Sequence, residues 1–144
     1  MSRAAIYDAI VNEPLLTDLG FDKSSVLVNY DGDQRPNDTM FMVLTWNQDS
    51  EGLRGDDICF IPVKSLTIWV HVYKQFSTDF LRIDNVLNIL DAVLGSMIDV
   101  GGTDGVTLSQ AIPGIRSRDL KDDAYQTICR SSSYKILDRV TASV

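Results

Sequence analysis

The chain has 144 residues and a formal net charge of −7, from 20 acidic and 13 basic side chains, and 44% of its residues are hydrophobic. This length suits one domain with its own core, so we expect residues 1–144 to form a single domain. The negative charge argues against a protein that binds nucleic acid through its phosphates, because such proteins concentrate lysine and arginine on the binding surface.

No targeting or spanning segment is visible in the sequence. Apolar runs stay well short of the roughly 20 residues that cross a membrane, and the first residues lack the apolar core of a signal peptide. We therefore expect a protein made and used in a cytoplasm, without a membrane partner. In that setting Cys59 and Cys129 are expected to be reduced packing residues.

The first part of the chain predicts helices, a short strand and a loop. Ser2 suits the cap of a first helix, and Pro14 suits the first turn of a helical continuation that ends at Gly20. Residues 26–30 predict a short strand. Residues 31–38 are dense in turn formers and predict a loop.

Two strands with a long connection come next. Thr39–Trp46 is apolar on both faces, which is typical of a central strand. Residues 47–65 have no clear period, so we expect a long, partly mobile connection there. In Leu66–Lys74 apolar residues alternate with Thr67 and the aromatic residues Trp69, His71 and Tyr73, which predicts a strand with one core-facing side.

The clearest pattern of the chain is a helical stripe. Apolar residues from Ile83 to Ile98 recur at about 100° per residue, and they predict a long amphipathic helix. Asp84, Asn88 and Asp91 fall opposite the stripe. They have the spacing of a carboxylate pair for acid–base chemistry, but a solvated helix face shows the same spacing, and we prefer that interpretation.

The remaining segments complete a fold class. Residues 101–105 predict a turn, residues 106–112 a strand, and the alternation from Tyr125 to Arg130 a final strand. The order of elements is then α-β-β-β-α-β(-β). It predicts an α+β domain with a small, mainly antiparallel sheet and two main helices packed on it.

His71 is the obvious candidate for chemistry, since it is the only histidine. Its neighbours on the same strand face are Trp69 and Tyr73, not carboxylates. There is no second histidine for a metal pair, and the cysteines lie at no zinc-site spacing. We therefore expect no enzyme, no metal and no cofactor, and place His71 on a half-exposed or interface face. A small hydrolase or metal-binding domain that uses His71 is the alternative from another class.

Three stretches carry a resemblance to a known family: RPNDTMFMVLTW, LTIWVHVYKQFSTDFLRIDNVLNILDAVL and RSRDLKDDAYQTICRSSSYKI. An Arg-Pro pair precedes a strand that ends in Trp46, Arg-Ile-Asp opens the long helix, and Asp-Leu-Lys-Asp-Asp precedes the final strand. This order resembles tail terminator proteins of long-tailed (siphovirus) bacteriophages, especially those infecting actinobacteria. The resemblance covers most of the chain, and the loop at residues 49–63 departs from it.

The resemblance implies a structural role in the virion. Such proteins form a ring, typically a hexamer, on the last ring of the major tail tube protein and so end tube growth. Their other face meets a head-completion or stopper protein, and DNA passes through the central hole without specific binding. The expected location is the head-proximal end of the tail, after assembly in the host bacterial cytoplasm. Another neck component, a head–tail adaptor or stopper, is the nearest alternative.

A ring of identical subunits needs contacts between two different faces of the chain. The aromatic side of Leu66–Lys74 and the segment 49–63 are the candidates for these contacts, because aromatic residues and arginine are enriched in interface centres. The candidate interface residues are Arg35, Trp46, Arg54, Trp69, His71, Tyr73 and Arg118. The negative charge of several copies would also keep DNA from binding to the lumen.

Overall fold

The structure, a computed structural model, describes residues 2–28, 39–54 and 60–138, with residues 48–54 and 60–63 described by their strand pairing alone. Its elements are α1 (Arg3–Val11), α2 (Pro14–Asp18), β1 (Val26–Leu27), β2 (Met40–Arg54), β3 (Phe60–Tyr73), α3 (Phe80–Gly95), β4 (Ile98–Gly101), β5 (Thr107–Arg116), β6 (Leu120–Asp122) and β7 (Thr127–Asp138).

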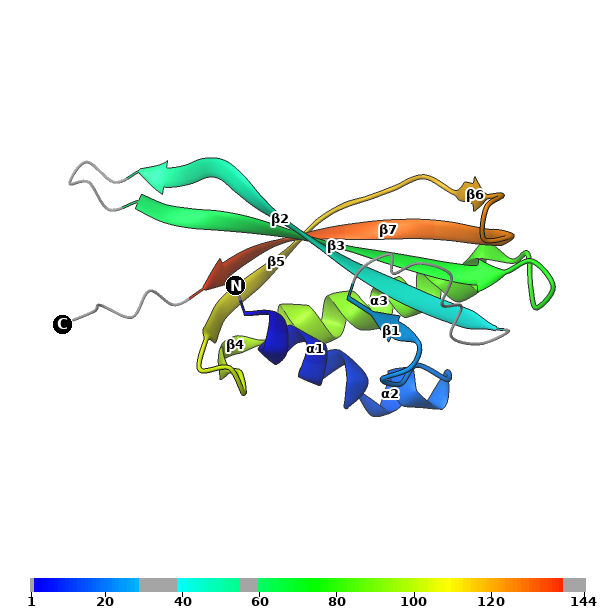
Figure 1. Cartoon of the computed structure of the whole chain (residues 1–144), viewed down its shortest axis with the longest axis horizontal. Coiled ribbons are helices and arrows are strands. Elements are labelled where there is room, and N and C mark those ends of the chain that lie inside the picture. The colour runs from blue at the N-terminus through cyan, green and yellow to red at the C-terminus, as the bar shows by residue number, and fades with distance from the viewer. Residues whose placement is uncertain (1, 29–38, 55–59, 139–144) are drawn as a thin grey trace.

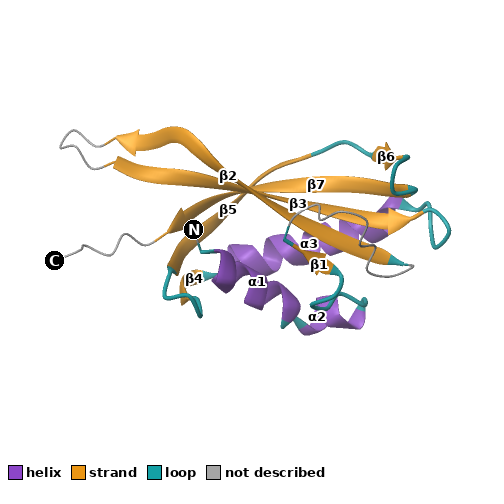
Figure 2. Ribbon diagram, in the orientation of Figure 1, coloured by secondary structure: helices purple, strands orange, loops and turns teal. Residues whose placement is uncertain are grey.

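These elements form one sheet with a helical layer (Figure 1). The strand order is β1-β2-β3-β7-β5-β4, with β6 pairing to β7. Of the described pairs, β1–β2 is parallel and the others are antiparallel. The three helices lie together on one side of the sheet (Figure 2). The predicted α+β class with a mainly antiparallel sheet is confirmed.

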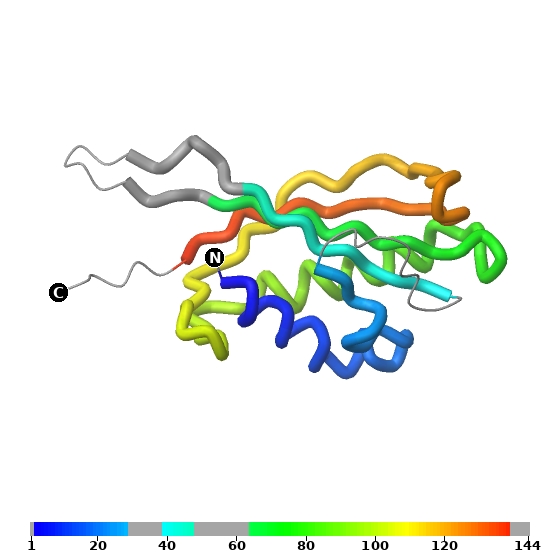
Figure 3. The backbone as a smooth tube through the Cα atoms, viewed as in Figure 1, coloured from blue at the N-terminus to red at the C-terminus, as the bar shows by residue number. Residues whose placement is uncertain are grey.

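Helix α3 supplies the main contact between the two layers. Its buried side chains follow the predicted stripe: Ile83, Val86, Leu87, Leu90 and Leu94. They share a core with the inward-facing residues of β3: Leu66, Ile68, Val70 and Val72. Full burial of each such side chain contributes about 1.5–3 kcal/mol, so this contact is a major source of the stability of the fold. Figure 3 shows the backbone of α3 crossing beneath the strands.

A side chain closes the N-terminus of α3. The Asp79 carboxylate accepts a hydrogen bond from the Leu81 backbone N–H at 2.9 Å. Asp79→Ala removes this acceptor, and we expect the free energy of unfolding to fall by about 1 kcal/mol. Urea unfolding measures the change. Thr78→Ala, an exposed position on the same turn, is the control and should stay within about 0.5 kcal/mol. Equal values for the two variants would contradict the cap.

The start of α1 follows the prediction, but Ser2 acts differently from an ordinary cap. Its hydroxyl makes no capping hydrogen bond to the helix. It donates instead to the Asp138 carboxylate at 2.5 Å, and the Lys64 ammonium binds the other oxygen at 3.0 Å. Ser2 therefore ties the first helix to the end of β7, although 136 positions separate the two residues.

The predicted long connection at residues 47–65 is wrong in most of its length. Strand β2 continues to Arg54 and β3 begins at Phe60, and the two remain paired over this region. A register shift between Gln48 and Gly52 interrupts the pairing. Extra residues in a bulge break the period-2 pattern, which explains why the strands were not visible in the sequence. The tip, residues 55–59, lies outside the described residues.

Other boundaries also differ from the prediction. The helical stripe predicts a helix that reaches Ile98, but α3 ends at Gly95, and Ile98 begins β4 and is 67% exposed. The first strand is shorter than expected and ends at Leu27. Strand β6 was not predicted, and the last strand begins at Thr127, not at Tyr125.

Candidate functional site: an open face of the sheet

His71 lies inside the protein, with 1% of its surface exposed. Its ring stacks on Phe41 with centroids 4.6 Å apart and planes within 3°, and its Nδ1 lies 2.9 Å from the Thr127 hydroxyl. Burial lowers the pKa of His71 to about 4, against a smaller opposing effect of Asp122. The imidazole is therefore neutral at pH 7. Because the side chain is buried, the expected half-exposed position is wrong. His71 is a packing residue with a hydrogen bond.

A small second core surrounds this histidine on the face away from the helices. Phe41, Val43 and Tyr73 form its centre, and Trp69 and Tyr125 pack against it. Tyr73 is only 8% exposed, so the expectation of a surface tyrosine is also wrong. Trp69 is partly buried, at the border of this core. The second core covers one end of the outer face of the sheet.

The rest of the outer face has less cover. The side chains of Thr67 and Trp69 point away from the helices, because residues alternate across a strand and their neighbours Leu66, Ile68 and Val70 belong to the main core. We define the open sheet face by six residues on this side of β2, β3, β5 and β7. They are Thr45, Thr67, Trp69, Ile112, Ser133 and Lys135.

The open sheet face carries little charge. Thr45 pairs with Thr67, which pairs with Ser133, and Ile112 pairs with Lys135. All of these side chains are partly or fully exposed, and Ile112 is 38% exposed. Lys135 is the only charged residue of the six, although acids outnumber bases in the chain. Trp69 and Ile112 are the apolar members of this face, and aromatic and apolar side chains at a surface favour contact with another macromolecule.

Polar residues of α3 are paired with the sheet, so the predicted solvated helix face holds only in part: Asn88 is exposed, whereas Asp84 and Asp91 are half-buried beside arginines. The Asp91 carboxylate accepts hydrogen bonds from the Arg116 guanidinium and from the Tyr134 hydroxyl, each at 2.6 Å. Arg116 also donates to the Asn88 side-chain oxygen at 2.8 Å. Burial, and then the bond to Asp91, raise the pKa of Tyr134, so its hydroxyl stays protonated.

A second arginine joins the other end of α3 to the sheet. The Arg130 guanidinium on β7 forms an ion pair with Asp84 of α3, and its Nε lies 3.4 Å from an Asp119 carboxylate oxygen. It also donates to the Ser117 carbonyl at 3.0 Å. Both arginines that face α3 are therefore neutralised by carboxylates. This arrangement fixes the helix on the sheet.

The seven candidate interface residues do not form one patch. Trp69 lies on the outer face, whereas Trp46 packs against the main core on the helical side, with the Arg3 guanidinium 5.6 Å from its ring centroid. Arg118 is exposed beyond the end of β5, and Arg54 is the last residue of β2. Arg35 lies outside the described residues.

Sequence reasoning missed four members of the open sheet face: Thr45, Ile112, Ser133 and Lys135. Lys135 was detectable in principle, because residues 132–137 alternate between buried and more exposed positions. Ile112 was placed on a strand, but a face cannot be assigned without knowing which side the helices cover. The interface role of Trp69 stays a prediction.

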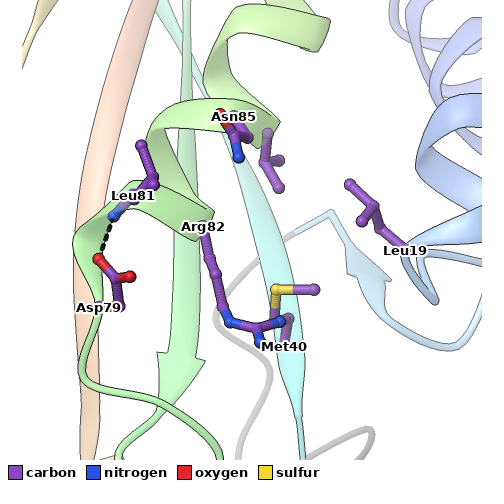
Figure 4. Close-up of a pocket in the computed structure, with 7 residues that line it drawn as sticks. Leu19, Met40, Asp79, Leu81, Arg82 and Asn85 are labelled. Carbon is purple, nitrogen blue, oxygen red and sulfur yellow. Dashed lines mark hydrogen bonds between the residues drawn. The ribbon is translucent and has the colours of Figure 1, made fainter.

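A second surface lies on the helical side, between α2 and α3. One pocket there has a volume of about 310 Å³ and includes Leu19 and Leu81, which lie on opposite sides of it (Figure 4). A neighbouring groove of about 410 Å³ includes Leu15, Ala92 and Val93. Leu15 and Leu81 are 57% and 59% exposed. We refer to these two hollows and their exposed leucines as the α2–α3 groove.

Comparisons with protein-family models, curated proteins and solved structures found no match for the chain. Within the described ranges, histidine, cysteine and carboxylate side chains form no group of three or more that could hold a metal ion. No helix in the part of the chain that the structure describes is long and apolar enough to span a membrane.

Proposed function

We propose that this chain is a structural assembly protein, a tail terminator of the long-tailed phage type. In this role it closes the end of the tail tube as a ring and stops its polymerisation. The ring joins the major tail tube protein to a head-completion protein, and DNA passes through its centre. The terminator assignment rests on the sequence resemblance that covers most of the chain.

The open sheet face is the observation that supports an assembly role most directly. A single chain covers the inner face of its sheet with α3 but leaves Thr45, Thr67 and Lys135 on the outer face accessible to solvent. Ile112 and Trp69 add apolar area to this face, and exposed apolar and aromatic side chains favour contact with another protein subunit.

The alternative of a small hydrolase depends on His71 as its acid–base residue, and the environment of His71 does not favour that role. An acid–base histidine works best with a pKa near the operating pH and with access to substrate. His71 is 1% exposed, and burial lowers its pKa to about 4. These properties fit a structural imidazole and favour the assembly hypothesis over a hydrolase that uses His71.

The location of the protein in the virion tests the proposal. We expect an antibody or gold label on this chain at the head-proximal end of the tail in electron micrographs. Label along the tube, on the capsid shell or at the distal tip would contradict it.

Particles from assembly-defective phages separate the terminator from its nearest alternative. A terminator should be present on free tails made without heads and absent from tailless heads. A head–tail adaptor or stopper should show the reverse distribution, which would replace our assignment within the same class of neck proteins.

A further inference from the structure

The open sheet face lacks acids, whereas the described acidic residues lie elsewhere. Its six members include Lys135 and no carboxylate. Copies of a chain with net charge −7 repel one another in general, so they can approach most closely where one of the two surfaces carries no acid. An acidic surface of another copy therefore meets no like charge among the six residues of this face.

The α2–α3 groove has the complementary properties. Leu15, Asp18 and Leu19 lie on one side of the short helix α2, because residues three and four positions apart share a helix face. The two leucines are 57% and 39% exposed, and Asp18 is exposed beside them. On α3 the neutral residues Ala92 and Val93 line the same groove. The two hollows are also lined by Glu13, Asp79 and Arg82, so the surface combines apolar contact area with two carboxylates and one guanidinium. Asp18, exposed beside Leu19, adds a third carboxylate that can face a lysine.

The two surfaces point in opposite directions. The helices lie on one side of the sheet and the open sheet face lies on the other (Figure 2). A contact between the face of one copy and the groove of another leaves a free groove on the first copy and a free face on the second. Such a heterologous contact can be repeated until a ring closes. A face-to-face pair would place two Lys135 residues on the same interface and would stop at a dimer.

We propose that the open sheet face of one copy packs on the α2–α3 groove of the next, with Lys135 facing Asp18. The occupant of each surface is thus a second copy of this chain. This inference rests on the proposed ring and specifies which surfaces build it. Trp69 and Ile112 supply apolar contacts on one side, and Leu15 and Leu19 supply them on the other.

Directed cross-linking distinguishes this arrangement from the alternatives. In a Cys59→Ser background, Thr67→Cys marks the face and Ala92→Cys marks the groove, while Cys129 stays buried. The two variants are mixed with tail tubes of the same phage, which provide the end on which a ring assembles, and treated with a short thiol cross-linker. We expect a cross-linked product that contains one chain of each kind, and little product from either variant alone.

Each other outcome contradicts the inference in a specific way. Products of Thr67→Cys alone would show face-to-face pairing, and products of Ala92→Cys alone would show groove-to-groove pairing. Rings without any cross-link would place the contact on other surfaces and leave the proposed function intact. A chain that forms no ring even on tube ends would contradict the proposed function itself.

A charge exchange tests the pairing of Lys135 with Asp18. Lys135→Glu and Asp18→Lys should each weaken ring formation about tenfold, and the double variant should recover most of this loss. Lys23→Glu, exposed outside both surfaces, is the charge-matched control for Lys135→Glu and should change assembly little. Native mass spectrometry of the rings gives the readout. Equal losses in the single and double variants would overturn the pairing.

Discussion

Asp91→Ala is expected to lower the free energy of unfolding by about 2 kcal/mol. The Asp91 carboxylate accepts hydrogen bonds from Arg116 and from the Tyr134 hydroxyl, and Tyr134 is 1% exposed. Alanine removes the acceptor from a buried hydroxyl and the counter-ion from a guanidinium. The Arg116 and Asp91 side chains are 26% and 30% exposed, so water replaces part of the lost ion pair and reduces the cost below that of a fully buried pair.

Urea unfolding followed by circular dichroism measures this effect, with two comparison variants. Asp91→Asn keeps an oxygen acceptor for Tyr134 and loses the charge, so its destabilisation should be smaller than that of alanine. Asp18→Ala removes an exposed acid and should change stability by less than about 0.5 kcal/mol. If Asp91→Ala behaves like Asp18→Ala, the polar contacts do not hold α3 on the sheet.

Acid is expected to destabilise the fold through His71, by about 3 kcal/mol between pH 7 and pH 4. Burial lowers the pKa of His71 from 6.5 to about 4 in the folded chain. Unfolded chains therefore bind a proton below about pH 6.5, whereas folded chains bind it only near pH 4. Protonation favours the unfolded state across this window, so stability falls as the pH falls. Below pH 4 the contribution of His71 levels off.

His71→Asn isolates this contribution. The asparagine amide can still bond to the Thr127 hydroxyl, but it does not titrate, so stability should vary less between pH 7 and pH 5 than in the wild type. The variant is less stable at pH 7 because it loses the stack on Phe41. Since His71 is the only histidine, an unchanged slope in this range would show that its protonation is not coupled to unfolding.

Local sequence patterns predicted the elements that have one solvent-facing side and one core-facing side. The alternation in Leu66–Lys74 identified the residues that face α3, and the stripe from Ile83 to Leu94 identified the residues of α3 that face the sheet. Both patterns repeat over many residues in a regular backbone, where the period alone determines the face. The α+β class followed from their order along the chain.

The errors arose where distant segments decide the environment. His71 is buried because Phe41 and Tyr125 lie against it, and these residues are 30 and 54 positions away in the sequence. Asp91 is paired because a strand 25 positions later brings Arg116 to it. Amphipathic spacing shows which side of a helix is polar but not whether that side meets water or a cation on a neighbouring strand.

The candidate surface was predicted only in part. Trp69 was placed on the outer side of its strand by alternation, which agrees with its position at the border of the second core. The division of that outer face into a covered end and an open end depends on Tyr125, which lies in the turn before β7. No local pattern indicates where such a turn will pack.

Tube growth in vitro tests the proposed function, that the chain ends tail-tube polymerisation, most directly. The tail tube protein of the same phage is polymerised with and without this chain, and tube lengths are measured by electron microscopy. We expect tubes that stop growing when the chain is added and that carry it as a ring at one end. Tubes that continue to grow with the chain present, or that bind it along their sides, would contradict the account.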